Sequence, residues 1–449
     1  MPLTLPTTPR DIGQRLWQLG GPVALQALLA STLGLIDTLM VNSLGPAALA
    51  GVGLVGRMMF VLTMVLAGLS SAAGVLVAQY SGGGRRHATR GPVVAATLLG
   101  LALTLPMTAA ALLAATPISR QLSDDPAVIE KAAQFLTWSA AYAPLTAITM
   151  MLATALRSTG NTRAPLWAGL VALGINSLLN ILFINGNFGF PAFGVAAAAV
   201  ATTCARLIEI AWLLNILRPG PLLRLPRSIR KKDTRNIIRG AAPLMAKEIA
   251  WAGGIMVSTL IISRMGALPL AALNLIQPIE GIMISVVYGC GVATGILIGQ
   301  ALGRGEFDKA YQSANRILRL IAWNALLVGF FVALLVEIIR RHEWLTGLIT
   351  PELHDPALFS LSIICIAFGA KAHNTIISVG ILRSGNDTPW LLGVDLCSMW
   401  LINLPLVYCA ALVLHWPLPA VVGVLMLEEI LKVGVFHWRV RSGRWLRRL

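Results

Sequence analysis

The chain has 449 residues, of which 56% are hydrophobic and only 12% are charged, and its mean hydropathy is +0.76. An ordinary globular protein carries about 25% charged residues, so this chain has too few polar side chains to cover a soluble surface. The composition excludes a secreted disulfide scaffold, a disordered chain and a cytosolic enzyme, and it predicts helices packed in a bilayer.

Apolar segments long enough to cross a bilayer occur throughout the chain. A helix needs about 20 mostly apolar residues to span about 30 Å of hydrocarbon, and this length predicts twelve transmembrane helices. The first six are expected at 16–44, 47–79, 91–115, 130–156, 164–185 and 191–217. The second six are expected at 237–264, 269–300, 311–338, 356–382, 388–414 and 417–438. The expected fold class is therefore an all-α polytopic membrane protein.

The excess of 35 Lys and Arg over 19 Asp and Glu is concentrated in alternate connections between the predicted helices. The basic residues gather near both ends of the chain and around 85–90, 157–163, 218–239, 304–319 and 383. In the predicted twelve-helix topology all of these segments lie on the same side of the membrane. An excess of Lys and Arg is typical of the cytoplasmic side. We expect both termini to be cytoplasmic, and the positive charge needs no nucleic-acid partner.

The two halves of the chain resemble each other at an offset of 221 residues. This offset relates Pro22 to Pro243, Thr38 to Thr259, Gly45 to Gly266, Gly68 to Gly289, Gly74 to Gly295 and Gln79 to Gln300. Because six is even, two six-helix repeats insert the same way up, as in some secondary transporters. We predict two six-helix lobes, 1–217 and 237–449, related by a parallel pseudo-two-fold repeat and joined by a cytoplasmic linker at 218–236.

Four polar residues are expected at similar depths in the outer half of the first lobe. A rise of about 1.5 Å per residue puts Asp37 about 12 Å from the outer end of its helix. By the same measure Asn176, Asn180 and Thr202 lie about 15, 9 and 16 Å deep. These oxygen-rich groups suit a hard cation such as Na⁺, or a proton carried by the carboxyl group. The alternative for the amides and the hydroxyl is ordinary hydrogen bonding between helices.

Charged residues are also expected inside the second lobe. Glu248 and Glu280 are predicted near mid-depth, where they would neutralise a cationic substrate or bind protons. The alternative is internal pairing, for example of Glu248 with Lys371. Two other groups, Arg206 with Glu209 and Glu428 and Glu429 with Lys432, have the helical spacing of structural ion pairs.

Arg57 is predicted at the same depth as Glu280, about 15–16 Å from the outer ends of their helices. A buried arginine is costly, and a carboxylate partner would offset that cost. The repeat would bring the two helices together, so one hypothesis pairs Arg57 with Glu280 across an outer cleft. The alternative pairs Arg57 with Asp37 inside the first lobe.

Three short segments carry a resemblance to a known family: GLIDTLMV at 34–41, ALRSTGNT at 155–162 and NSLLN at 176–180. With the repeat, they resemble the multidrug and toxic compound extrusion (MATE) family, and its NorM-like bacterial branch in particular. The resemblance implies an antiporter of the bacterial inner membrane that exports organic, often cationic, compounds in exchange for Na⁺ or H⁺. It also implies that Asp37 and the helix-five residues form a cation site.

The sequence departs from the NorM-like pattern in the second lobe. Several such proteins have carboxylates there in helices seven and ten, whereas this chain has Lys371 in helix ten and Trp251 near the expected place in helix seven. A second-lobe Na⁺ site is therefore not expected.

Enzyme chemistry finds little support in the sequence, because there is no G-x-x-x-x-G-K-[ST] phosphate loop and the six His form no metal-ligand pattern. We expect no cofactor beyond the coupling ion. The expected partners are an amphipathic small molecule and membrane lipid, and the expected functional unit is a monomer. Two alternatives remain: a channel, and a flippase for a lipid-linked saccharide. Such a flippase usually needs a strongly basic cavity, for which Arg57, Lys247 and Lys371 are the candidates.

Overall fold

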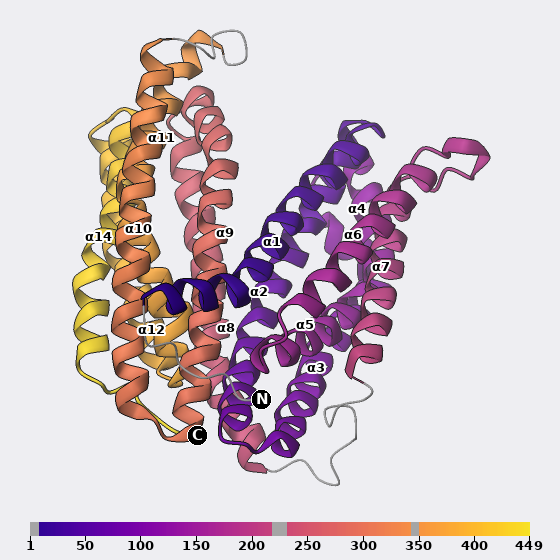
Figure 1. The fold of residues 1–449 in the computed structure, drawn as a ribbon. Coiled ribbons are helices and arrows are strands. Elements are labelled where there is room, and N and C mark those ends of the chain that lie inside the picture. The colour runs from indigo at the N-terminus through magenta and orange to yellow at the C-terminus, as the bar shows by residue number, and fades with distance from the viewer. Residues whose placement is uncertain (1–8, 218–230, 343–349) are drawn as a thin grey trace. The chain divides into compact units, whose positions relative to one another are not determined.

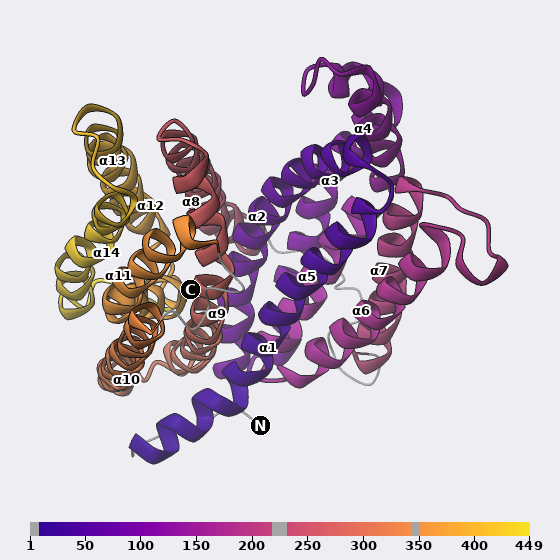
Figure 2. The same ribbon diagram turned by 90° about the horizontal axis from the view of Figure 1, so that it is seen from above.

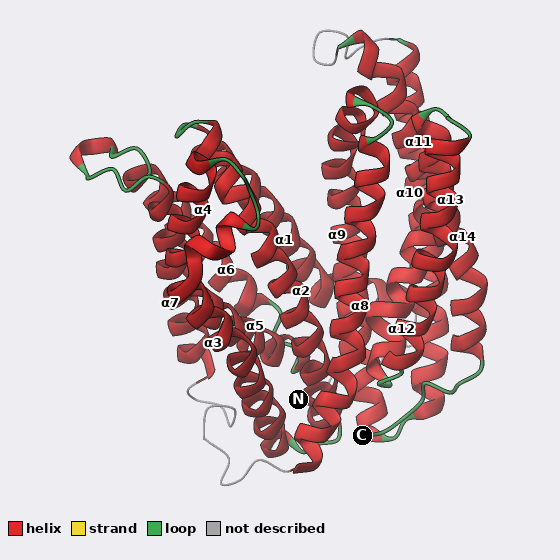
Figure 3. Cartoon of the chain, turned by 180° about the vertical axis from the view of Figure 1, so that it is seen from behind, coloured by secondary structure: helices red, strands yellow, loops and turns green. Residues whose placement is uncertain are grey.

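The computed structural model describes residues 9–217, 231–342 and 350–449, without the side chains of residues 9, 31–39 and 86. All regular secondary structure in this part of the chain is helical, as Figure 3 shows, and the expected all-α fold class is confirmed.

The helices are labelled in Figure 1. Those of the first half are α1 (Pro9–Asn42), α2 (Pro46–Gly82), α3 (Arg90–Arg120), α4 (Pro126–Ser139), α5 (Tyr142–Ser158), α6 (Arg163–Phe183) and α7 (Val195–Leu217). Those of the second half are α8 (Lys231–Ser263), α9 (Ala267–Arg304), α10 (Phe307–Arg341), α11 (Pro351–Thr375), α12 (Thr388–Leu396), α13 (Leu404–Tyr408) and α14 (Leu418–Arg441). Three π-helical stretches, Ile376–Leu382, Cys397–Asn403 and Cys409–Val413, continue α11, α12 and α13. Short 3₁₀ turns lie at Arg86–Thr89 and Asn187–Gly189.

Within the described residues, nine helical segments are long and apolar enough to cross a membrane, or ten if the bent pair α4 and α5 forms one span. They account for ten of the predicted spans, from 47–79 to 388–414. The other two predicted spans are helical in α1 and α14. In α14 the apolar stretch is interrupted by Glu428, Glu429 and Lys432. The number twelve stays a prediction.

The helix predicted at 130–156 is broken into α4 and α5, which are bent by 47°. Pro144 explains the break, because a proline has no N–H to donate and its ring clashes with the carbonyl four residues before it. That carbonyl belongs to Ala140, and its oxygen accepts a hydrogen bond from Thr108 Oγ1 of α3 at 2.9 Å.

The chain folds into two compact units. We call residues 25–245 the first unit, and residues 1–24 together with 246–449 the second unit. These bounds differ from the predicted lobes, because the start of α1 belongs to the second unit and the start of α8 to the first. The two bounds, 24 and 245, are separated by the same 221 residues as the sequence repeat. The repeat itself stays a prediction.

The two helix starts pack tightly in their units. Ile12, Leu16 and Leu19 of α1 are buried in one apolar cluster with residues of α9 and α10, and Figure 2 shows the indigo start of α1 beside these helices. A Cβ atom at Gly289 of α9 would overlap the carbonyl oxygen of Gly20. Close packing in the second unit therefore depends on a glycine at position 289.

The start of α8 has the corresponding packing in the first unit. Ile237, Ala241 and Leu244 are buried, and a Cβ atom at Gly68 of α2 would lie 2.8 Å from the backbone nitrogen of Met245. Gly68 and Gly289 are related by the 221-residue offset. Residues 231–236, which were expected in the linker, thus form the first turns of α8, whereas 218–230 lie outside the described residues.

Candidate functional site

A cavity of about 410 Å³ lies inside the first unit, between α1, α2, α4, α5, α6 and α7. Its walls combine apolar side chains, such as those of Phe60 and Phe135, with polar ones. The polar lining residues are Gln26, Thr63, Tyr142, Thr146, Asn176, Thr202, Arg206 and Glu209. The cavity can therefore hold an amphipathic molecule of small-drug size, since ligand pockets commonly enclose about 300–1,000 Å³.

Three of the four predicted first-lobe residues are joined by hydrogen bonds. Asn180 Nδ2 of α6 donates to Asn176 Oδ1 at 3.2 Å, and Asn176 Nδ2 donates to Thr202 Oγ1 of α7 at 3.2 Å. The Thr202 hydroxyl donates in turn to the carbonyl oxygen of Ala198 at 2.9 Å. Asn176 is 2% exposed, and together with Thr202 it lines the cavity. The structure therefore brings these three side chains together, and two of them, Asn176 and Thr202, lie on the cavity wall.

Asp37, the fourth residue of the predicted set, belongs to α1. Its side chain lies outside the described residues, so its contact with the amides stays a prediction.

Sequence reasoning did not place Glu209 at the cavity. Its Oε2 lies 2.7 Å from Nη1 of Arg206, which confirms the predicted ion pair. Its side chain is 3% exposed and lines the same cavity as Thr202, which stands seven residues earlier on α7. Residues seven apart share a helix face, so the spacing was a signal that could have found this carboxylate.

The segment ALRSTGNT contacts one of the side chains that line the cavity, that of Gln26. Arg157 Nη1 donates to Gln26 Oε1 at 3.2 Å, and Gln26 Nε2 donates to the carbonyl oxygen of Pro165 at 3.3 Å. Arg157 Nη2 donates to Thr154 Oγ1 at 3.0 Å. This arginine thus fixes the position of a cavity-lining glutamine between α1, α5 and α6.

The second unit contains a network of ion pairs that joins α8, α12, α14 and Arg383, the residue directly after the π-helical stretch that continues α11. We call it the charge network; its members are Lys247, Glu248, Arg383, Asp395, Glu428, Glu429 and Lys432. Arg383 Nη2 lies 2.9 Å from Glu248 Oε1, and Lys247 Nζ lies 3.8 Å from the same oxygen. Lys247 Nζ is also 3.4 Å from Asp395 Oδ2. The first half of the network is therefore continuous.

Lys432 connects the second half of the network. Its Nζ lies 2.9 Å from Glu428 Oε1, 3.6 Å from Glu429 Oε1 and 3.7 Å from Asp395 Oδ1. The predicted pairing of Lys432 with the two glutamates is confirmed. Asn374 Nδ2 donates to Glu429 Oε2 at 2.8 Å, and this bond ties α11 to the network.

Lys371 and Glu280 form a separate ion pair between α11 and α9. The pairing of Glu248 with Lys371, which was the example of internal pairing, is therefore wrong. Glu248 pairs instead with Arg383 and Lys247.

Arg57 is exposed on α2. Its pairing with Glu280 or with Asp37 stays a prediction.

A comparison of the sequence with models of protein families shows to which family the chain belongs. A family model described as MatE matches residues 22–182 and 243–409 of the chain. The chain belongs to the MATE family. The two matched segments begin at the same 221-residue offset as the sequence repeat.

Two curated relatives and one solved structure show how far the likeness to MATE proteins extends. The uncharacterized transporter YisQ of Bacillus subtilis (strain 168) is 25% identical over 98% of this chain and 96% of its own length. The multidrug resistance protein MdtK of Edwardsiella ictaluri (strain 93-146) is 24% identical over 87% and 86%. The crystal structure of the Vibrio cholerae MATE transporter VcmN in the bent form matches with a TM-score of 0.85 at 18% identity, over 98% and 99% of the two chains. At that identity the last match concerns the fold alone.

The MATE family and the apolar helices together establish a membrane transporter. The candidate site is accordingly a cavity inside one unit of a transporter, with an amide–hydroxyl chain on its wall.

Proposed function

We propose that this chain is a cation-coupled antiporter that exports amphipathic, cationic small molecules from the bacterial cytoplasm. The observation that carries the proposal is the amphipathic cavity of the first unit, on whose wall Asn176 and Thr202 lie among apolar side chains. The multidrug resistance protein MdtK among the relatives supports drugs or toxic compounds as the substrate class.

Asp37 is the proposed coupling residue. Ala30 and Val41 of α1 line the cavity. Ala30 precedes position 37 by seven residues and Val41 follows it by four, and residues at these spacings share one face of a helix. A carboxylate on that face would join amide and hydroxyl oxygens in a set suited to Na⁺ or to proton exchange. A cation drives transport only if it binds one conformation better than the other. We therefore assign Asp37 a cation affinity that differs between the inward- and outward-open states.

The second unit is not proposed as a coupling site. Lys371 puts an ammonium group in the region of helix ten where several NorM-like proteins have a carboxylate, and it already pairs with Glu280. Glu248 has two cationic neighbours, Arg383 and Lys247. A further cation would have to compete with these groups, so coupling by the first unit alone is the simpler arrangement.

The charge of the cavity argues against an anionic lipid-linked saccharide as the substrate. Arg206 is the one cationic side chain in its described lining, and the carboxylate of Glu209 pairs with it. A flippase for an anionic lipid-linked saccharide would need a surplus of basic side chains there. The proposal further includes a monomeric transporter in the inner membrane with both termini in the cytoplasm, as the basic connections favour.

Ethidium transport by inverted membrane vesicles tests the function directly. We expect uptake into the vesicles when either a pH gradient or a Na⁺ gradient is imposed, and imposing them separately identifies the coupling ion. Counterflow, in which unlabelled substrate on one side drives accumulation of labelled substrate on the other, is expected for an antiporter. A channel dissipates gradients and gives no counterflow. A lack of counterflow, with ethidium flux retained, would therefore contradict the proposal.

A further inference from the structure

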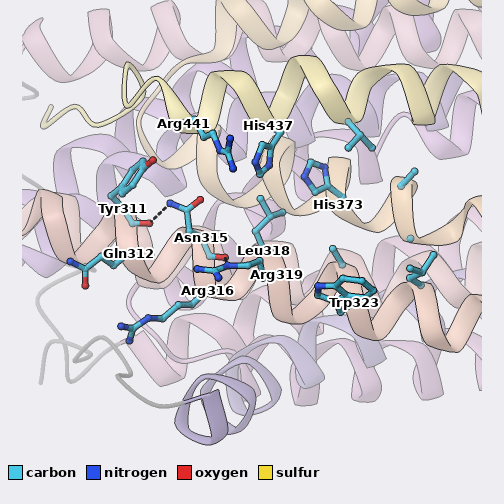
Figure 4. A pocket seen from close by; sticks show the side chains of 15 residues that line it. Tyr311, Gln312, Asn315, Arg316, Leu318, Arg319, Trp323, His373, His437 and Arg441 are labelled. Atoms are coloured by element: carbon cyan, nitrogen blue, oxygen red, sulfur yellow. Dashed lines mark hydrogen bonds between the residues drawn. The ribbon is translucent and has the colours of Figure 1, made fainter.

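A second, more basic pocket lies in the second unit, between α10, α11 and α14 (Figure 4). Its volume is about 810 Å³, and we call it the basic pocket. Three arginines line it: Arg316 and Arg319 of α10 and Arg441 at the end of α14. No acidic side chain is among the described residues that line it, so the pocket is cationic.

The pocket changes from polar to apolar along α10. Gln312, Arg316, Arg319 and Trp323 follow one another at spacings of four, three and four residues, which places them on one helix face. The same face continues to Leu326. The arginines are therefore nearer the N-terminal end of α10, at Phe307, and the apolar residues lie further along the helix.

Helix α14 shows the same change in the opposite chain direction. Arg441, His437 and Val433 line the pocket at four-residue spacing, again from charged to apolar. Figure 4 shows Arg441 and His437 projecting from α14 toward the side chains of α10. His373 of α11 completes this side, with its ring centroid 5.8 Å from that of His437. The polar ends of two helices thus meet at the same end of the pocket.

The apolar end opens to the outside of the helices. Trp323 is 63% exposed, and α10 continues with the exposed apolar side chains of Leu327 and Phe330. Because α10 is apolar and long enough to cross a membrane, we infer that this exposed apolar face meets hydrocarbon. The lipid phase is therefore the direct source of a ligand for the pocket.

We propose that the basic pocket binds one anionic phospholipid. Its phosphate lies between Arg319 and Arg441, and an acyl chain follows Trp323 and Leu326. The ten residues from Arg316 to Leu326 rise about 15 Å, which is about half of the hydrocarbon thickness and so the reach of one leaflet. Basic pockets between transmembrane helices are a known form of anionic headgroup site. The lipid site is separate from the proposed transport cavity and does not depend on it.

Native mass spectrometry of the full-length protein in detergent tests the site. Phosphatidylglycerol is titrated against phosphatidylcholine with the same acyl chains, and glycerol 3-phosphate is added as a competitor without chains. We expect bound phosphatidylglycerol to exceed bound phosphatidylcholine. Replacing Arg319→Gln and Arg441→Gln together should weaken phosphatidylglycerol binding roughly 25-fold, or about fivefold per basic residue.

The matched control is Lys309→Gln. It removes one positive charge at the same end of α10, but Lys309 is 70% exposed and lies outside the pocket. Binding should change less than twofold. If the double arginine variant does not fold, Ala370→Phe fills the apolar end without changing charge, and it should also reduce binding.

Three results would overturn the proposal. One is equal weakening by Lys309→Gln, which would indicate nonspecific attraction to the basic end. Another is equal binding of phosphatidylcholine, which would remove the role of the arginines. The third is full displacement by glycerol 3-phosphate at the lipid concentration, which would make a free phosphate compound the ligand.

Discussion

Two carboxylates of the first unit have different assignments. Glu209 is buried and has Arg206 at 2.7 Å. Removing Arg206 would leave this carboxylate without its charged partner, so we assign Glu209 to the stability of the cavity wall. Asp37 is the residue assigned to exchange a cation or proton, and it is the position at which loss of charge should matter most.

The prediction for this residue is that Asp37→Asn folds normally and loses coupled efflux. The substitution keeps the size of the side chain but removes the group that gains and loses charge. Gradient-driven ethidium transport in proteoliposomes should fall at least tenfold, with an unchanged elution profile in gel filtration. Asp124→Asn, at an exposed position between α3 and α4, is the control and should transport normally. Normal transport by purified Asp37→Asn would remove the residue from the mechanism.

At the scale of helices, the break between α4 and α5 depends on two side chains. Pro144 removes the helical donor for the carbonyl of Ala140, and Thr108 supplies a replacement. We predict that Thr108→Val destabilises the protein by about 1–2 kcal/mol, because the carbonyl loses its partner. In a Pro144→Ala background the restored N–H can bond to that carbonyl, so the same substitution should cost close to nothing. A double-mutant cycle from reversible unfolding in mixed micelles measures this difference, and equal costs in both backgrounds would contradict the explanation.

The helices also show which features could be predicted from the sequence. The four-residue spacing of Asn176 and Asn180 placed them on one face, because the geometry of a helix fixes such neighbours. The partner of Glu248 could not be predicted in this way. Arg383 is 135 residues away, and the pairing depends on how α8 and the end of the π-helical stretch are rotated. Hydropathy measures length and polarity, and it contains no information on that rotation.

At the scale of the whole molecule, each half of the chain contributes the start of its first helix to the other half's unit. Residues 9–24 pack in the second unit through Ile12, Leu16 and Leu19. Residues 231–245 pack in the first unit, where Tyr80 Oη donates to Asp233 Oδ1 at 2.7 Å. The sequence repeat predicted two lobes but not this exchange, because the offset compares equivalent positions and does not say with which neighbours they pack.

The exchange changes what is expected when the chain is cut between the two halves. Fragments 1–225 and 226–449 each contain one helix start that belongs to the unit formed mainly by the other fragment. Expressed alone, fragment 1–225 leaves Ile12, Leu16 and Leu19 without their buried neighbours, and fragment 226–449 leaves Ile237 and Leu244 in the same position. Burying a side chain of this size contributes about 1.5–3 kcal/mol, so either fragment alone should be degraded or aggregate.

Co-expression supplies both sets of neighbours, and the pair should co-purify and restore ethidium efflux at least in part. Fluorescence size-exclusion chromatography of the single and paired fragments measures the outcome. A fragment that is stable and monodisperse by itself would show that the exchanged helix starts are not needed to complete its unit.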